Sequence, residues 1–128
     1  SVSYDLEERD IPGVSGVAIF EERENGETLV TLDLEGTEEG GEHPAHIHMG
    51  SIEDAPAAIA ITFTPVNGAT GMSMTNVSMT DGSADAEGEA ITYTELLAYD
   101  GYINVHKSAE ELDVLAAQGN MGANASEE

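Results

Sequence analysis

The residues of this chain best suited to chemistry are its histidines, and three of the four lie close together in the sequence. They are His43, His46 and His48, in the segment EHPAHIHM. Because side chains alternate between the two faces of a β-strand, His46 and His48 would share one face and Ile47 would point to the other. Imidazole nitrogens are common ligands of copper and zinc, so this spacing suits a metal site.

The fourth histidine, His106, ends a second strand-like segment, YINVH. Its branched apolar residues would face a core, whereas His106 would face away from that core together with Tyr102 and Asn104. If the two segments are neighbours, His46 and His48 converge with His106. Three imidazoles with an open coordination position can bind Cu(II) or Zn(II), and copper binds such nitrogen ligands more tightly. Tyr102 and Asn104 would then lie beside the ligands.

Other residues are candidates for additional ligands. His43 has the opposite strand parity and would have to bend in as a fourth ligand. Met49 also has the opposite parity, and a place in the core or at the rim is its alternative. Met72 and Met74 share a strand face and could hold Cu(I), because thioethers are soft ligands, but filling gaps in the core is the alternative for both. For the histidines, the alternative is a protein surface that binds no metal.

The charge of the chain excludes several classes of partner. Acidic residues number 26 and basic residues three, which gives a formal net charge of −23. A nucleic-acid binder needs clustered lysine and arginine, and an anionic membrane surface would repel this chain. Repulsion among so many carboxylates is screened at about 1 M salt, where the Debye length is about 3 Å, so the composition suits a protein from a salt-loving organism.

Composition also bears on location and metal chemistry. No apolar run reaches the length of a membrane-spanning helix, so we expect no membrane insertion. There is no cysteine, which excludes disulfides, thiolate metal sites and thiol catalysis. The sequence reads as a mature chain whose export signal has been removed, so we expect an extracellular, periplasmic or cell-surface location.

Short alternating segments separated by Gly, Asn and Asp predict an all-β fold of about seven to eight strands, arranged as a Greek-key β-sandwich. One or two short helices are expected, at Thr94–Tyr99 and from Ser108 to about Val114, where SAEE has the form of a capping box. The chain length predicts a single domain over residues 1–128. Its polar tail would be residues 122–128. The predicted strands, besides the two that carry histidines, are Val14–Glu22, Thr28–Glu35, Ala57–Thr64, Gly71–Thr80 and Leu115–Met121.

Several motifs resemble the CHRD (chordin-type) domain family, in its exported bacterial form. They are HPAHIH at residues 43–48, DGYINVH at 100–106, RDIPGVSG at 9–16 and AQGNMG at 117–122. The resemblance covers roughly residues 9–122. It implies an immunoglobulin-like or superoxide-dismutase-like Greek-key β-sandwich, and the histidines of the family would correspond to His46, His48 and His106.

The segment HIH also resembles the copper motif of copper/zinc superoxide dismutases, which is a more distant similarity. The match ends there, because that family needs further histidines and an aspartate for zinc, a disulfide, and an arginine beside the copper. This chain has no cysteine and no arginine after Arg23. Dismutase activity is therefore not expected.

Three functions remain open from the sequence. The first is an extracellular copper-binding module, with zinc as the less favoured metal, for storage, delivery or electron transfer. The second is a structural cell-surface domain or fibre subunit, in which the segment Ser1–Asp10 forms an N-terminal strand or arm that pairs with its own domain or self-associates by strand addition. The third is a metal-dependent oxidoreductase, which no general base at defined spacing supports.

Overall fold

The computed structural model describes residues 1–55, 57–83 and 87–125, with β-strands as the main element. Ten strands form one antiparallel sheet in the order β4-β7-β8-β3-β2-β1-β10-β9-β5-β6. The elements in chain order are β1 (Val2–Glu8), β2 (Ser15–Glu22), β3 (Thr28–Glu35), β4 (Glu42–His43), β5 (Ala45–Met49), the 3₁₀ turn η1 (Ile52–Asp54), β6 (Ile59–Thr62), β7 (Val66–Asn67), β8 (Met72–Val77), α1 (Tyr93–Leu97), β9 (Asp100–Ser108) and β10 (Glu111–Gly122).

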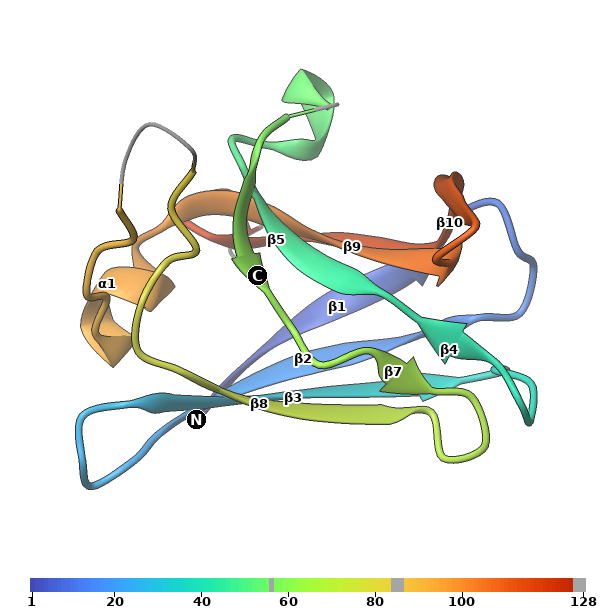
Figure 1. Ribbon diagram of the computed structural model, residues 1–128, viewed down its shortest axis with the longest axis horizontal. Coiled ribbons are helices and arrows are strands. Elements are labelled where there is room, and N and C mark those ends of the chain that lie inside the picture. Colours follow the sequence, from blue (N-terminus) through green and yellow to red (C-terminus); the bar gives the residue numbers. More distant parts are fainter. Residues whose placement is uncertain (56, 84–86, 126–128) are drawn as a thin grey trace.

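Strand β1 joins the two halves of this sheet. Its first part pairs with β2, and its last two residues, Glu7 and Glu8, pair with β10. Figure 1 shows β1 passing from the layer of β2, β3 and β8 to the layer of β5, β9 and β10. Gly119 of β10 permits this close approach, because a Cβ at that position would collide with the carbonyl oxygen of Asp5. The predicted N-terminal strand is therefore used within its own domain, and self-association through it stays a prediction.

The hairpin of β5 and β6 carries His46 and His48 and lies where the sheet curls back toward its other end. β5 pairs with β6 at one end of the strand order, while β4 and β7, which flank them in the chain, pair at the other end. Pro44 separates β4 from β5, and a proline cannot donate a ladder hydrogen bond, which suits a change of strand partner. The all-β class is thus confirmed, with ten strands instead of seven or eight. The sandwich arrangement and Greek-key connectivity stay predictions.

The core lies inside the curl. In β3, the alternate residues Val30, Leu32 and Leu34 are almost completely buried, as the period of two predicts. The rings of Tyr4 and Phe20, from the neighbouring strands β1 and β2, meet edge to face with 5.3 Å between their centroids. Burial of such aliphatic and aromatic side chains is the main stabilising contribution in a chain without disulfides.

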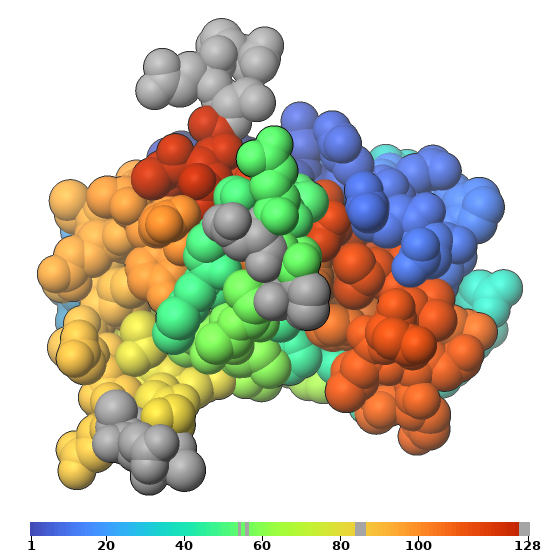
Figure 2. All heavy atoms as spheres, turned by 90° about the horizontal axis from the view of Figure 1, so that it is seen from above, coloured from blue at the N-terminus to red at the C-terminus, as the bar shows by residue number. Residues whose placement is uncertain are grey.

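Strand β9 departs from simple alternation because it is buried on both faces. Ile103 and Val105 face the core, yet Tyr102, Asn104 and His106 on the opposite face are at most 7 % exposed. Two chain segments reach that outer face: the backbone of Ala57, before β6, contacts His48, and the backbone of Leu112, at the start of β10, contacts His106. In Figure 2 the segment that leads into β6, in green, crosses this face, and the region of the β9–β10 turn, in dark orange, lies to its right. The histidine face is therefore partly shielded from solvent.

One of the two predicted helices forms and the other does not. Helix α1 is present, and Thr92 and Glu95 form a capping box at its start. The predicted helix from Ser108 is wrong, because this segment is the turn between β9 and β10. The Ser108 hydroxyl does accept a hydrogen bond from the Glu111 N–H at 3.1 Å, but that local bond stabilises a hairpin turn as well as a helix start. None of the described helices has the length and apolarity needed to cross a membrane.

The core face of the histidine strand can be tested with a pair of isoleucines. Ile47 is fully buried, whereas Ile59 of the neighbouring strand β6 is 42 % exposed. We expect Ile47→Ala to lower the free energy of unfolding by about 2–5 kcal/mol, because it removes buried methyl groups and leaves a cavity. Ile59→Ala, the matched control, should lower the free energy of unfolding much less. Urea unfolding of both variants measures this, and equal losses would contradict the assigned strand faces.

Candidate metal centre

Strands β5 and β9 bring the distant histidines together. They pair antiparallel, with His46 opposite Asn104 and His48 opposite Tyr102. The backbone N–H of His106 donates to the carbonyl oxygen of Pro44 at 2.8 Å, which extends the same pairing. The prediction that the two segments are neighbours is therefore confirmed. Because directly opposite residues project to the same side of a sheet, His46, His48 and His106 share the outer face.

The three imidazole rings form a compact group. The ring centroids are 5.1 Å apart for His46 and His106, 5.8 Å for His46 and His48, and 6.3 Å for His48 and His106. One nitrogen from each ring lies within 4.8 Å of the other two. In the part of the chain that the structure describes, this is the group of three side chains placed to bind a metal ion.

Backbone carbonyl groups fix the orientation of two of these rings. His48 Nδ1 lies 2.8 Å from the carbonyl oxygen of Ala57, and His106 Nδ1 lies 2.7 Å from that of Leu112. A carbonyl oxygen can only accept, so each Nδ1 carries the proton and donates it. Each Nε2 is then left with its lone pair. Metal-binding histidines are usually held by a hydrogen bond of this kind from the second ring nitrogen.

His46 completes the group from the more exposed side. Its Nδ1 lies 3.2 Å from His106 Nε2. Because His106 carries its proton on Nδ1, His46 Nδ1–H is the donor of this bond and His106 Nε2 the acceptor. A metal ion held by His46 through Nδ1 would require this proton to move to Nε2 of the same ring, so the imidazole would stay neutral. The Nε2 of His48 is buried and has no hydrogen-bond partner among the described residues. A metal would supply that partner.

Burial and mutual repulsion lower the pKa of two of these imidazoles, His46 and His106. Desolvation, followed by the neighbouring His106 and His48, lowers the pKa of His46 from 6.5 to about 4, and Asp81 opposes this lowering. Desolvation also lowers the pKa of His106, against the opposing effect of its hydrogen bond to Leu112. Only neutral imidazole can bind a metal, so both rings are in the binding form throughout the neutral pH range.

The spacing of the nitrogens is close to what one metal ion requires. A metal–imidazole bond is about 2.0–2.1 Å long, so two nitrogens on the same ion are at most about 4.2 Å apart. A separation of 4.8 Å, the upper limit in this group, exceeds that value by about 0.6 Å. Small ring rotations would close this gap, and the less buried His46 is the ring most free to make them.

The two additional candidate ligands lie outside the group. His43 is buried, and its Nδ1–H donates to the carbonyl oxygens of His106 and Lys107 at 3.1 and 2.9 Å. It therefore holds β4 against the end of β9 and helps to position His106. Met49 follows His48 in β5, so its side chain leaves the strand on the other face, and it is 47 % exposed.

The two residues expected beside the ligands are both in contact with the site region. The ring of Tyr102 stacks on that of His48, with 5.1 Å between centroids and 11° between planes. Asn104 lies opposite His46, and its Oδ1 accepts a hydrogen bond from Gln118 Nε2 at 2.7 Å. Both side chains are buried, so they support the rings from within the sheet face.

Sequence reasoning missed other participants. The carbonyl groups of Ala57 and Leu112 belong to the backbone, which leaves no signal in residue type. Asp81 is held opposite His46 because Thr62, the β6 partner of His46, donates to its two carboxylate oxygens from Oγ1 at 2.6 Å and from N–H at 3.2 Å. It is one acidic residue among 26, so its position could not be recognised from the sequence.

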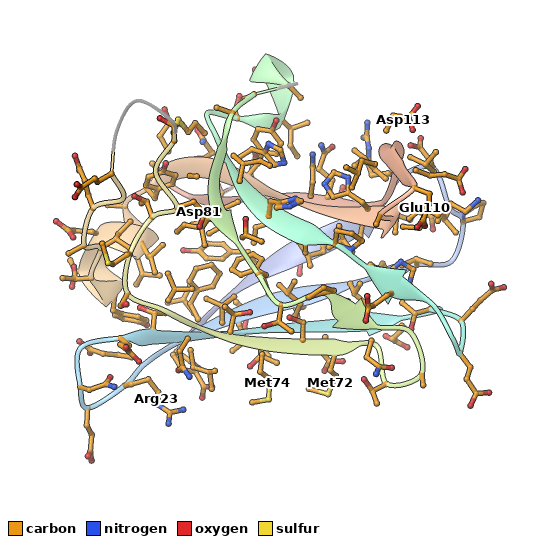
Figure 3. All side chains as sticks on the ribbon, viewed as in Figure 1. Arg23, Met72, Met74, Asp81, Glu110 and Asp113 are labelled. Carbon is orange, nitrogen blue, oxygen red and sulfur yellow. The ribbon has the colours of Figure 1, made fainter. Side chains whose placement is uncertain are left out.

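The methionine pair is not part of the core. Met72 and Met74 are 39 % and 56 % exposed, and Figure 3 shows them pointing away from the core on the outer side of β8. The core alternative for these two residues was therefore wrong, because the alternation of β8 places Ser73, not the methionines, inside.

Comparisons with known proteins do not assign this chain to a family. A scan against protein-family models and searches of curated proteins and of solved structures found no match. The resemblance to the CHRD family therefore stays a prediction.

The lowered pKa of His46 predicts a pH dependence of stability. In the unfolded chain the imidazole of His46 takes up a proton near pH 6.5, whereas in the folded protein it does so near pH 4. Between these values the unfolded state binds more protons, so this residue lowers the free energy of unfolding as the pH falls from 6.5 to 4.

The comparison with His46→Gln isolates this effect from the titration of the many carboxylates. We expect the stability of the metal-free protein relative to His46→Gln to decrease from pH 7 to pH 4, as measured by urea unfolding with a chelator present. A difference that is the same at every pH would show that His46 is not held neutral.

Proposed function

We propose that this domain binds a copper ion through His46, His48 and His106. The observation that carries the proposal is the convergence of three imidazoles, two of which are held by backbone carbonyl groups so that Nε2 is free to bind. A surface histidine without a ligand has no need of such fixed hydrogen bonding. Here the rings are buried or half-buried, and desolvation lowers the pKa of His46 and His106.

The donor set favours copper over zinc. All three side-chain donors are nitrogen, and the chain has no cysteine to supply the thiolates typical of structural zinc sites. For the same nitrogen site, Cu²⁺ binds more tightly than Zn²⁺ in the usual order of divalent metals. Three protein ligands also leave a coordination position for water or for a ligand from a partner, which suits a site that takes up and passes on its metal.

The charge of the chain supports an extracellular copper-handling role. A net charge of −23 attracts cations to the surface and raises their local concentration near the site. The same excess of carboxylates suits a high-salt medium, in which their repulsion is screened. Within this proposal the domain is an exported, CHRD-type β-sandwich module that binds copper at the outer face of β5 and β9.

Metal analysis of the purified protein tests the proposal. After exposure to equal amounts of copper and zinc and removal of loosely bound ions in about 2 M salt, which screens the acidic surface, the wild type should retain close to one copper per chain. The double variant His46→Ala/His106→Ala should retain essentially none, because it loses two of the three nitrogens.

A matched control is the histidine outside the group. His43→Gln keeps a side-chain N–H that can donate to the carbonyl groups of β9, so this variant should retain its copper. Wild-type protein without bound metal, or equal copper in the wild type and the double variant, would overturn the proposal. Retention of zinc instead of copper would keep the site and correct the metal.

A further inference from the structure

The exposed apolar side chains of this protein are mainly methionines. Six large hydrophobic side chains are exposed in the described part of the chain, and four of them are Met49, Met72, Met74 and Met79. Methionine usually fills gaps in a core, but its thioether is also a ligand for soft metal ions. Because the chain has no cysteine, methionine is its only source of sulfur ligands.

Strand β8 carries two of these methionines on the same outer face. Ser73 between them is buried, whereas Met72 and Met74 are exposed, as the period of two requires. Figure 3 shows both side chains on the outer side of β8, pointing away from the core, with their sulfur atoms in yellow. Both thioethers are therefore open to an ion from solution.

The spacing along β8 suits two sulfur ligands of one ion. Residues i and i+2 of an antiparallel strand are about 6.8 Å apart. A metal–sulfur bond is about 2.3 Å long, so two sulfurs on the same ion are at most about 4.6 Å apart. The unbranched methionine side chain has three rotatable bonds, so a lean of about 1 Å by each thioether closes this difference.

The neighbours of the pair favour a cation. Met72 pairs across the sheet with Asp33 of β3, which therefore projects to the same outer face, and on its other side with Asn67 of β7. Met72 and Met74 also line a depression of about 430 Å³ to which Glu42 belongs, and no lysine or arginine is part of its described lining. A cation that approaches the thioethers thus meets neutral and negative side chains.

We propose that Met72 and Met74 bind Cu(I), at a second copper site separate from the histidine group. Two neutral thioethers are soft ligands and select Cu(I), whereas Cu²⁺ and Zn²⁺ bind better to nitrogen or thiolate ligands. Cu(I) accepts a low coordination number, so a pair of sulfurs with a ligand from solvent completes its shell. Asp33 and Glu42 raise the local concentration of the cation without being its ligands.

The methionine pair and the histidines lie on different faces of the molecule. Strand β8 belongs to the layer of β2 and β3, whereas the histidines lie on the outer face of the layer that contains β5 and β9 (Figure 1). The core separates the two layers, so one ion cannot be shared. The inference is therefore independent of the proposed histidine site, from which it differs in ligands and in the oxidation state of the metal.

The test uses Cu(I) alone as the probe, added to the full chain without oxygen and in the presence of ascorbate. About 1 M sodium nitrate, in which the Debye length is about 3 Å, suppresses general attraction to the acidic surface. In carbon NMR spectra of the methionine methyl groups, we expect the signals of Met72 and Met74 to shift together and to saturate with one ion for the pair. The signals of Met49 and Met79 should not move.

Two double variants decide whether sulfur at these positions binds the ion. Met72→Leu/Met74→Leu keeps the apolar volume and removes both sulfurs, so in competition with a Cu(I) chelator it should retain one Cu(I) per chain fewer than the wild type. Met49→Leu/Met79→Leu removes as many exposed sulfurs from other segments and should bind like the wild type.

Equal Cu(I) content in the wild type and Met72→Leu/Met74→Leu would overturn the proposal, as would equal shifts of all four exposed methyl groups or no shift of Met72 and Met74 at excess Cu(I). None of these results bears on the histidine group, whose own test uses histidine variants.

Discussion

The antiparallel register between β5 and β9 is the constraint on which the candidate site depends. It places His46 and His48 beside Tyr102 and Asn104 and brings His106 next to Pro44. A slip of one residue would turn the histidines of β5 into the core and its apolar residues out to solvent. Burial of Ile47, Ile103 and Val105 on the inner face therefore stabilises the register in which the three imidazoles meet. The inner face of the β5–β9 pair therefore packs in the core, and its outer face carries the three histidines.

The covering segments turn three neighbouring histidines into a defined group. Without them the outer face of β9 would be open to water, and the rings of His48 and His106 would lose the hydrogen bonds that orient them. The segment before β6 supplies the Ala57 carbonyl, and the start of β10 supplies that of Leu112. These two acceptors set which ring nitrogen carries the proton, while burial lowers the pKa of His46 and His106. The two carbonyl groups thus orient the rings of His48 and His106 in the metal-free protein.

Much of the site followed from alternation alone. Strand parity placed His46, His48 and His106 on one face and separated His43 and Met49 from them, and the structure agrees with that placement. Parity is readable because the period of a strand is two and the opposite face must be apolar. The same reasoning gave the all-β class, but it could not count the strands made by two-residue pairings such as β4 with β7.

The failures have physical causes as well. The Ser108 motif satisfies a local hydrogen bond in a turn as readily as in a helix, so tertiary pairing of β10 decided its conformation. Met72 and Met74 alternate with small polar residues, so their strand gave no clear inner face, and hydrophobicity pointed to the wrong one. The closeness of Gly119 to β1 and the carbonyl groups above the histidines depend on distant chain segments. Such features leave no mark in local sequence.

In the copper-loaded protein, we expect three imidazoles, and not the carboxylates of this very acidic chain, to bind the metal. X-ray absorption spectroscopy of the copper-loaded protein tests this most directly, because it reports the ligand atoms and their distances. We expect a first shell dominated by imidazole nitrogens at about 2.0 Å, with the outer-ring scattering of histidine, and loss of that signal in His46→Ala/His106→Ala. A first shell of oxygen atoms without imidazole scattering, unchanged in that variant, would contradict it.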